Sequence, residues 1–250
     1  MSTKFRSYLF LLICQAILPV ALHGQVTYQP YSFSTFAGTA GLSGSADGTG
    51  SAARFTSPAE VALDGANNLY VADISRLVTI DTKTGKVTHT LEIEGAKFLN
   101  DVTVDKAGSV YVSDSNTGKI HVVKGNKAEV YFEGPEIKGV NGLLCVGNEL
   151  YVVDFPSGGN YKLSADKKLT KVCATAEGAD GVVPVGKDEY IVSSWHGEIA
   201  YVNSKGESKK LLDTRDKKLS SADIEYDPST KTVFVPTFNA NTVMAYTFSK

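Results

Sequence analysis

The chain has 250 residues and a formal net charge of −2, from 25 Lys and Arg against 27 Asp and Glu. This near balance gives no electrostatic reason to expect nucleic acid or an anionic membrane as a partner. A hydrophobic fraction of 42% excludes a disordered chain, and three cysteines exclude a disulfide-dense scaffold.

Residues 1–24 are typical of a secretory signal. Lys4 and Arg6 precede a short apolar run, and cleavage is expected after Gly24. The run is short for a bilayer span, which needs about 20 apolar residues; an uncleaved anchor is the alternative. No later segment is long and apolar enough to span. We therefore expect residues 25–250 to form a single secreted or periplasmic domain, with no transmembrane segment after cleavage.

The rest of the chain repeats one motif five times. One large apolar position recurs about every 40 residues, at Tyr70, Tyr111, Tyr151, Ile191 and Phe234. Each unit has four short runs rich in Val, Ile, Tyr and Phe, separated by turn residues, which predicts four strands. In the second unit we expect strands at 101–104, 109–114, 119–124 and 128–132.

A repeat of about 40 residues with four antiparallel strands predicts an all-β fold, a β-propeller of five blades. The last unit ends after three strands, the third over 242–248. We expect the lone strand candidate Tyr31–Phe36 to complete that blade and close the ring. Residues 37–57 are predicted to be a long surface loop. A sixth, truncated blade before residue 57 is the alternative.

The two cysteines of the mature chain are predicted to be free and buried. Cys145 falls in the first strand of its unit and Cys173 in the fourth. Three strand spacings place them roughly 14 Å apart. A disulfide needs Cα atoms within about 7 Å.

Several motifs carry a resemblance to known propeller families. The stretches FSTFAG (33–38) and ADGTGSAARFTSPAEVALDGANNLYVAD (46–73) resemble an NHL repeat. FLNDVTVD, GVNGLL and GADGVV resemble the gluconolactonase family, which includes regucalcin, the senescence marker protein. Together they cover most of residues 33–250. The resemblance implies a usually six-bladed lactone hydrolase with a divalent metal, commonly calcium, on its axis.

The resemblance also implies metal ligands. Asn141 matches an Asn in the family's PNGL-like motif, Asp180 matches the Asp of a DG motif, and Asn100 matches a further Asn of the site. The resemblance also implies a Glu ligand in the first blade, but this chain has no Glu at the matching position of the repeat. Ala59 occupies that position and Glu60 follows one residue later.

One position, at the start of each innermost strand, varies between repeats and is expected to ring the axis. It is occupied by Ala59, Asn100, Asn141, Asp180 and Ala222. The next position is occupied by Glu60, Asp101, Gly142, Gly181 and Asp223. Such oxygen donors suit calcium or magnesium, and no Cys or His spacing suggests zinc. A water-filled polar channel without an ion is the alternative.

Aspartates that recur in the repeats are predicted to be structural. One set follows first strands, where Asp bonds its own backbone in turns, and another ends second strands. The two sets are Asp64, Asp105 and Asp227, and Asp73, Asp114 and Asp154.

The loops between second and third strands should lie at the same end of the central channel as the position that varies between repeats. Trp195 and His196 lie side by side in one of them, and His can transfer protons near neutral pH. A Trp that covers the blade beside an exposed His is the alternative. The predicted substrate-binding residues are Trp195, Glu60, Arg76, Phe155 and Asn239.

Two functional hypotheses follow. The first is a metal-dependent hydrolase of a lactone or related ester, in which Asp101, His196 or Asp223 takes the proton and the ligand is a lactone or sugar-derived molecule. The second is a non-catalytic NHL-type binding propeller for a glycan or protein. In both we expect a monomer that binds no nucleic acid.

Overall fold

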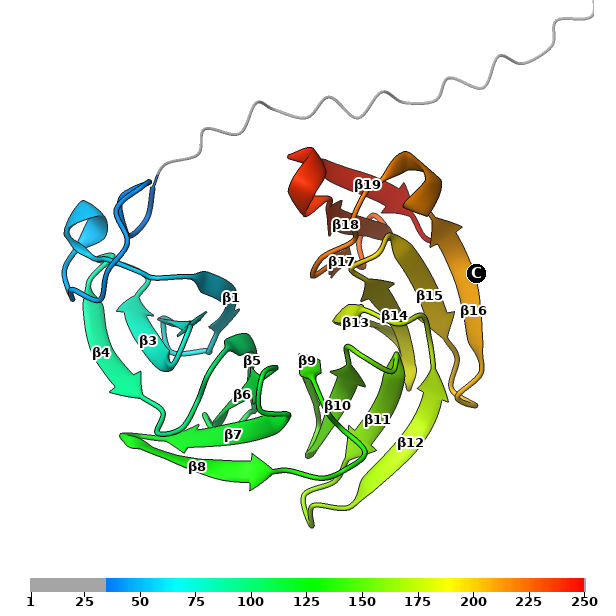
Figure 1. Cartoon of the computed structure of the whole chain (residues 1–250), viewed down its shortest axis with the longest axis horizontal. Coiled ribbons are helices and arrows are strands. Elements are labelled where there is room, and N and C mark those ends of the chain that lie inside the picture. The colour runs from blue at the N-terminus through cyan, green and yellow to red at the C-terminus, as the bar shows by residue number, and fades with distance from the viewer. Residues whose placement is uncertain (1–34, 250) are drawn as a thin grey trace, which may run out of the picture. The chain divides into compact units, whose positions relative to one another are not determined.

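The computed structural model describes residues 35–249. Figure 1 shows five antiparallel sheets that follow one another around a common axis in chain order. Helical structure in this range is limited to three 3-10 turns: η1 (Gly50–Ala52), η2 (Arg215–Lys217) and η3 (Phe238–Ala240). The predicted all-β propeller with five blades is confirmed. Within the same range no helix has the length and apolar character needed to cross a membrane.

Four blades have four strands each, and neighbouring strands pair in chain order. Blade 1 contains β1 (Pro58–Leu63), β2 (Asn68–Asp73), β3 (Arg76–Asp81) and β4 (Val87–Glu92). Blade 2 contains β5 (Leu99–Val104), β6 (Val110–Asp114), β7 (Lys119–Lys124) and β8 (Lys127–Phe132). Blade 3 contains β9 (Val140–Val146), β10 (Glu149–Asp154), β11 (Gly159–Leu163) and β12 (Leu169–Ala174). Blade 4 contains β13 (Ala179–Gly186), β14 (Glu189–Ser194), β15 (Glu198–Val202) and β16 (Ser208–Asp213).

Blade 5 has three strands in the described range: β17 (Glu225–Asp227), β18 (Thr232–Pro236) and β19 (Val243–Thr247). The strand expected to complete it, 31–36, lies mostly outside the described residues, and Thr35 and Phe36 are not in a strand. The predicted signal segment also lies outside this range. Residues 37–57 form a loop with one 3-10 turn and isolated bridges. The alternative of a truncated sixth blade there is therefore wrong.

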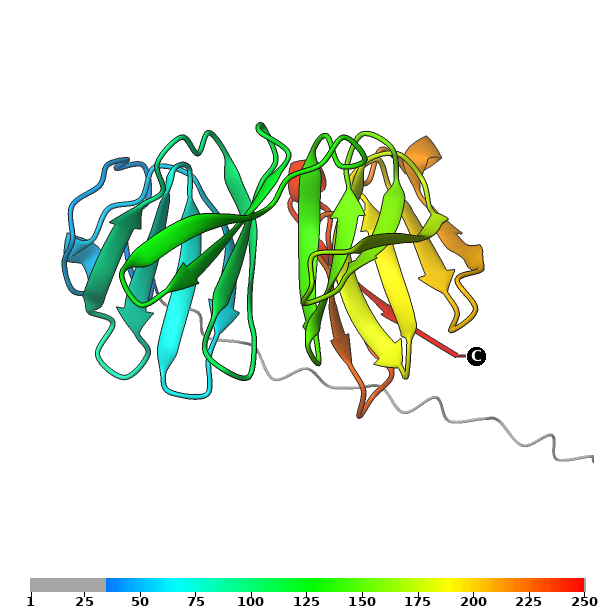
Figure 2. The same ribbon diagram turned by 90° about the horizontal axis from the view of Figure 1, so that it is seen from below.

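The core lies between neighbouring blades. Leu99, Val112, Ile120 and Val140 are all 0% exposed. Burying one such side chain stabilises the fold by about 1.5–3 kcal/mol. The β-branched and aromatic residues of the repeats favour strands because they fit this packed, pleated surface. Figure 2 shows the sheets from the side, with the strands running between two faces of the propeller.

The recurring aspartates have the predicted structural roles. Asp64 and Asp105 each accept two N–H bonds within the turn that follows their strand. Those that end second strands each accept from two consecutive N–H groups of the segment leading into the same blade. These pairs are Asp73 with Thr56 and Ser57, Asp114 with Lys97 and Phe98, and Asp154 with Lys138 and Gly139.

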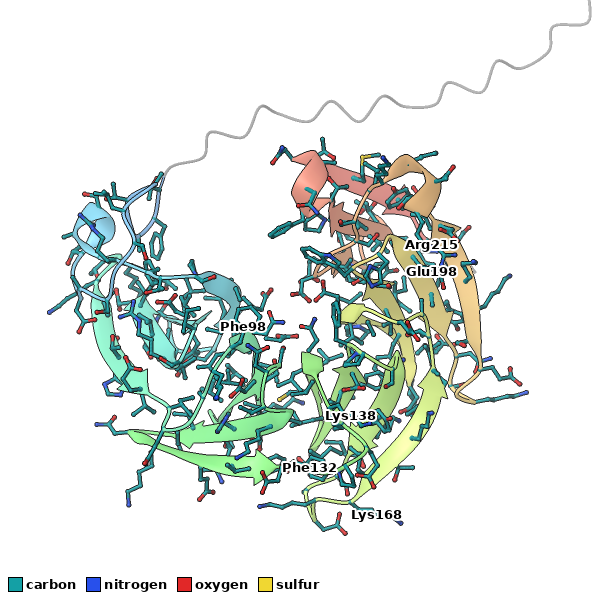
Figure 3. All side chains as sticks on the ribbon, viewed as in Figure 1. Phe98, Phe132, Lys138, Lys168, Glu198 and Arg215 are labelled. Atoms are coloured by element: carbon teal, nitrogen blue, oxygen red, sulfur yellow. The ribbon has the colours of Figure 1, made fainter. Side chains whose placement is uncertain are left out.

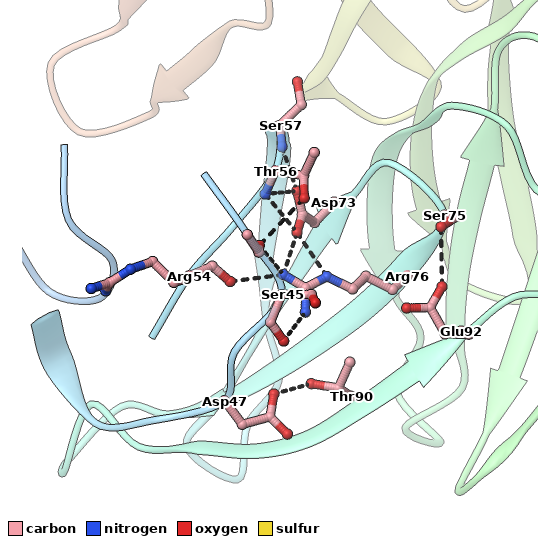
Figure 4. Close-up of polar contacts among 11 residues, drawn as sticks. Ser45, Asp47, Arg54, Thr56, Ser57, Asp73, Ser75, Arg76, Thr90 and Glu92 are labelled. Carbon is pink, nitrogen blue, oxygen red and sulfur yellow. Dashed lines mark hydrogen bonds and ion pairs between the residues drawn. The ribbon is translucent and has the colours of Figure 1, made fainter. Parts of the chain in front are cut away.

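A charged clasp fastens the loop 37–57 to blade 1 (Figure 4). The Arg76 guanidinium donates to Asp73 Oδ2 from Nε at 2.9 Å and from Nη2 at 2.7 Å. Its nitrogens also donate to the carbonyl oxygens of Gly44, Ser45 and Arg54 at 2.8–3.1 Å. Both partners of the ion pair are buried. We call this arrangement the Arg76 clasp.

The two cysteines are free, as predicted. Both are half-buried rather than fully buried. Desolvation raises the pKa of the Cys145 thiol to about 11. It therefore remains a neutral thiol at physiological pH.

Candidate functional site

Polar side chains gather where the innermost strands begin, at one face of the propeller near its axis. β5, β9 and β13 each place a predicted ring residue there, and residues of β1 and of the segment before β17 join them. We call this the axial mouth, defined by Glu60, Asn100, Asp101, Asn141, Asp180 and Asp223.

Two glycines allow the innermost strands to approach closely. A Cβ added at Gly142 would overlap the backbone oxygen of Asp180 in the next blade. One added at Gly181 would lie 2.7 Å from the backbone nitrogen of Ile224 and 2.8 Å from Asp223. The absence of a side chain at these two positions therefore brings blades 3, 4 and 5 together at the mouth.

The three predicted metal ligands form a row of hydrogen bonds. The Asn100 side-chain amide donates to Asn141 Oδ1 at 2.7 Å, and the Asn141 amide donates to Asp180 Oδ1 at 2.8 Å. Asn100 also donates to Ser115 Oγ, which donates in turn to the carbonyl of Val140. Equivalent positions of neighbouring blades are thus in contact, as the repeat phase predicted.

This row does not suit the calcium site implied by the resemblance. The amide oxygen of Asn141 and one carboxylate oxygen of Asp180 already accept hydrogen bonds from their neighbours in the row. Calcium needs six to eight oxygen ligands around one point. Over residues 35–249, no three His, Cys, Asp or Glu side chains are arranged to hold a metal ion.

The carboxyl groups of the mouth have raised pKa values. Burial raises the pKa of Asp180 to about 7, against a lowering by its hydrogen bond from Asn141, and the charge of Glu60 raises it further. Burial also raises the pKa of Asp223 well above its usual value, and the charges of Asp101 and Asp180 raise it further. The charges that shift these two groups are all carboxylates.

The carboxyl groups of Glu60 and Asp223 interact directly. Their side chains are joined by a hydrogen bond that links blade 1 to blade 5. An ionised carboxylate can only accept, so one of the two carries the proton of this bond. Burial raises the pKa of Glu60 as well. Both side chains are half-buried, which leaves the pair within reach of solvent at the mouth.

Asp101, a predicted catalytic residue, ties two blades together. Its Oδ2 accepts the N–H of Leu143 in blade 3 at 2.7 Å, and its own N–H donates to Ser113. It is 6% exposed, and burial raises its pKa well above the usual value. Ser193 makes a similar link between blades 4 and 5, which sequence reasoning missed. Its Oγ accepts the N–H of Gly181 and donates to the carbonyl oxygen of Ala222.

The predicted loop residues lie outside the carboxyl cluster but on the same face. Trp195 is half-buried against Phe238, with ring centroids 4.6 Å apart. His196 is exposed, and its ring is 6.1 Å from that of Phe155. Asn239 is exposed in η3. The structure therefore shows no contact between these side chains and Asp180 or Asp223.

His196 instead lines a separate cavity of about 610 Å³ between blades 3 and 4. Glu198 and Arg215, labelled in Figure 3, form an ion pair at its wall. Lys210 joins the same network through Glu198 and Asp213. The charges of this cavity are thus largely neutralised by one another.

Arg76 is a correction to the predicted substrate-binding set. Its side chain is 4% exposed, and its guanidinium is fully used in the Arg76 clasp. It was expected at the mouth because it was assigned to the loop between the second and third strands, but the loop 37–57 folds over it.

Comparison with known proteins supports the fold and leaves the activity open. No family model and no curated protein matches the chain. Among solved structures, it is similar to a catalytically inactive virginiamycin B lyase from Staphylococcus aureus with quinupristin, at a TM-score of 0.65 and 12% identity over 77% of this chain and 66% of that one. A streptogramin B lyase gives a TM-score of 0.61 at 13% identity, covering 77% and 69%.

A nidogen/laminin complex gives a TM-score of 0.64 at 17% identity, covering 76% of this chain and 75% of that one. Identities this low show a shared β-propeller fold. Because one such fold is a lyase and another is in a protein complex, fold alone does not choose between catalysis and binding.

Proposed function

We propose that the axial mouth opens a neutral cyclic ester, such as a lactone, with its own carboxyl groups as base and acid. The observation that carries the proposal is a set of interacting carboxyl groups at the mouth whose pKa values are raised. The pKa of Asp180 is about 7, and burial also raises the pKa values of the hydrogen-bonded pair Glu60 and Asp223, which in this proposal holds one proton. Carboxyl groups held in different protonation states supply a base and an acid to one reaction.

In this mechanism the Asp180 carboxylate takes a proton from a water molecule, whose oxygen adds to the ester carbonyl carbon. The Glu60–Asp223 pair donates its proton to the ring oxygen as the carbon–oxygen bond breaks. The product is a hydroxy acid. Asp180 then loses its proton to solvent and the pair regains one, which restores the starting state. Asn141 is the positioning residue, since it holds one oxygen of Asp180.

The charge of the mouth suits this substrate class. A closed lactone is neutral, and its hydrolysis product is an anion. A cluster of carboxylates repels anions, so it admits the substrate and favours release of the product. Anionic esters such as phosphorylated sugars would be poor substrates for the same reason.

The carboxyl cluster also favours a second candidate, a binding propeller that holds an ammonium or guanidinium group of a protein partner. The charges acting on Asp180 and Asp223 are all negative, and an incoming cation would offset them. The likeness to a propeller in a nidogen/laminin complex is consistent with such a role.

A panel of neutral lactones, assayed from pH 5 to 10, tests the proposal. We expect turnover to rise with pH through about 7 as Asp180 ionises, and to fall at higher pH as the shared proton is lost. Asp180→Asn should lower turnover at least about 100-fold. The matched control is Asp64→Asn, in a turn on blade 1, with turnover unchanged.

Turnover that a chelator abolishes would contradict catalysis by the carboxyl groups alone. Absence of turnover, together with binding of an arginine- or lysine-rich peptide that Asp180→Asn weakens, would favour the second candidate.

A further inference from the structure

A second cavity, of about 380 Å³, lies between blades 2 and 3 on the side away from the axial mouth. It is bordered by the turns that follow β5, β9 and β11. In Figure 3, Phe132 and Lys168 mark the outer parts of these two blades. The lining includes two tyrosines, one thiol and two carboxylates: Tyr111, Tyr131, Cys145, Asp105 and Glu149. Its size suits a small ligand.

The cavity arises from a difference between repeats. Between blades 3 and 4, the ring of Tyr151 packs on that of Tyr190, with centroids 4.0 Å apart. One blade earlier, Tyr111 is the counterpart of Tyr151, but the counterpart of Tyr190 is Leu150. A leucine fills less space than a tyrosine ring, which leaves room beside Tyr111.

Two tyrosine rings form a corner in this cavity. The centroids of Tyr111 and Tyr131 are 4.9 Å apart and their planes meet at 74°. We call this pair the aromatic corner. The Lys167 ammonium already lies 5.3 Å from the centroid of the Tyr131 ring. The negative face of an aromatic ring attracts such cations, most strongly where water is excluded.

Asp105 places a negative charge beside the corner. Asp105 Oδ2 accepts the hydroxyl of Tyr111 at 3.3 Å. Burial raises the pKa of Asp105, but hydrogen bonds from Ser109 and Ala107 outweigh it and hold the pKa below its usual value, so the carboxylate stays ionised. Burial raises the pKa of Tyr131, and the nearby Asp105 carboxylate raises it further, which places a negative charge near that ring.

Three other ionisable side chains also line the cavity. Glu149 adds a second carboxylate, and the exposed Lys106 adds one ammonium. Cys145 is a neutral thiol at physiological pH, because desolvation raises its pKa to about 11. It is therefore a poor nucleophile and serves as an apolar wall.

We infer that the aromatic corner is a binding site for a small alkylammonium group, held over the rings of Tyr111 and Tyr131 and paired with Asp105. The site is independent of the axial mouth. It lies between the opposite ends of blades 2 and 3, and none of the mouth carboxylates lines it.

Calorimetric titration at pH 7.5 with choline, and with its neutral isostere 3,3-dimethylbutan-1-ol, tests this inference. The two probes have the same shape and differ in charge. We expect choline to bind at least about tenfold more tightly, as a partly desolvated cation–π contact provides. Equal affinities, or no binding of choline, would overturn the inference.

Variants locate the site. Tyr131→Leu should abolish choline binding, whereas Tyr131→Phe, which keeps the ring, should retain it. Asp105→Asn should weaken binding several-fold. Its matched control is Asp64→Asn, because Asp64 bonds the Tyr70 hydroxyl at 3.2 Å in the equivalent turn of blade 1.

Asp180→Asn separates this site from the axial mouth. We expect choline affinity to be unchanged in that variant. Loss of choline binding in Asp180→Asn, with retention in Tyr131→Leu, would place the cation at the mouth and overturn the inference. A melting curve for Tyr131→Leu that matches the native chain confirms that loss of binding is not loss of folding.

Discussion

Two regions of the propeller bury carboxylates and surround them differently. In the Arg76 clasp, Asp73 is 1% exposed and accepts from Arg76 and from two backbone N–H groups. At the axial mouth, Asp180 is 5% exposed and accepts one bond from Asn141, while the charge acting on it is another carboxylate. The first carboxylate is matched with hydrogen-bond donors and a cation, whereas the second lies near a like charge.

The difference separates scaffold from site. A carboxylate that serves the fold is matched with donors, because an unmatched buried charge costs stability. A carboxylate whose pKa is moved toward neutrality costs stability but gains the ability to exchange protons. The raised pKa values of the carboxyl groups at the mouth are therefore better evidence for function than the recurrence of Asp along the chain.

The largest effect is expected from breaking the clasp. Asp73→Ala leaves Arg76 as a buried, unpaired charge, and the unfolding free energy should fall by about 3–5 kcal/mol. Glu133→Ala is the control. It removes an exposed ion pair with Lys119, which should cost less than about 1 kcal/mol. Urea unfolding of both variants measures this contrast, and equal losses would contradict the distinction.

Replacing an aspartate with asparagine, which has the same shape but no charge, should change the unfolding free energy in opposite directions in the two environments. Asp114 is 0% exposed; burial alone would raise its pKa, but His121 and the N–H groups of Phe98 and Lys97 hold it below its usual value. Asp114→Asn should therefore cost about 1.5–3 kcal/mol of unfolding free energy. Asp180→Asn should instead gain on the order of 1–3 kcal/mol at pH 8. Losses in both variants would show that the mouth is ordinary scaffold.

A loss of unfolding free energy of intermediate size is expected where the inner strands approach each other closely. Gly142→Ala forces a methyl group against the Asp180 backbone and should cost about 1–3 kcal/mol. Gly65→Ala is the matched control, since nothing lies within 4 Å of its added Cβ. Thermal melting of both variants tests this, and an unchanged Gly142→Ala would indicate that the blades shift freely.

The smallest effect concerns the pH of half-maximal activity. Asn141→Leu removes the hydrogen bond that lowers the pKa of Asp180. The acidic limb of the turnover profile should therefore move to higher pH by a fraction of a unit. Asn100→Leu, one step further along the row, is the control and should move it less. Equal shifts in both variants would contradict a direct role for Asn141.

The sequence predicted most of the scaffold because the scaffold is local and periodic. Runs rich in Val, Ile, Tyr and Phe, separated by turn signals, predicted the strands, and the repeat phase correctly brought Asn100, Asn141 and Asp180 together. Two features depend on contacts between distant segments instead. Arg76 is covered by the loop 37–57, which lies outside the repeat, and Glu60 meets Asp223 only because the first and last blades come together at the axis.

The measurement that tests the account most directly is the unfolding free energy from pH 5 to pH 8. Asp180 binds its proton more tightly in the folded than in the unfolded chain, because its folded pKa of about 7 exceeds the usual aspartate pKa of 3.8. Its contribution to stability is therefore present at low pH and is lost as pH rises through 7.

The scaffold carboxylates Asp64, Asp105 and Asp114, whose pKa values are lowered, change stability only below this range. The native chain should thus lose stability from pH 5 to pH 8, and Asp180→Asn should remove much of that loss. Stability that rises or stays constant in the native chain would contradict the claim that the axial carboxyl groups are held against their preferred charge.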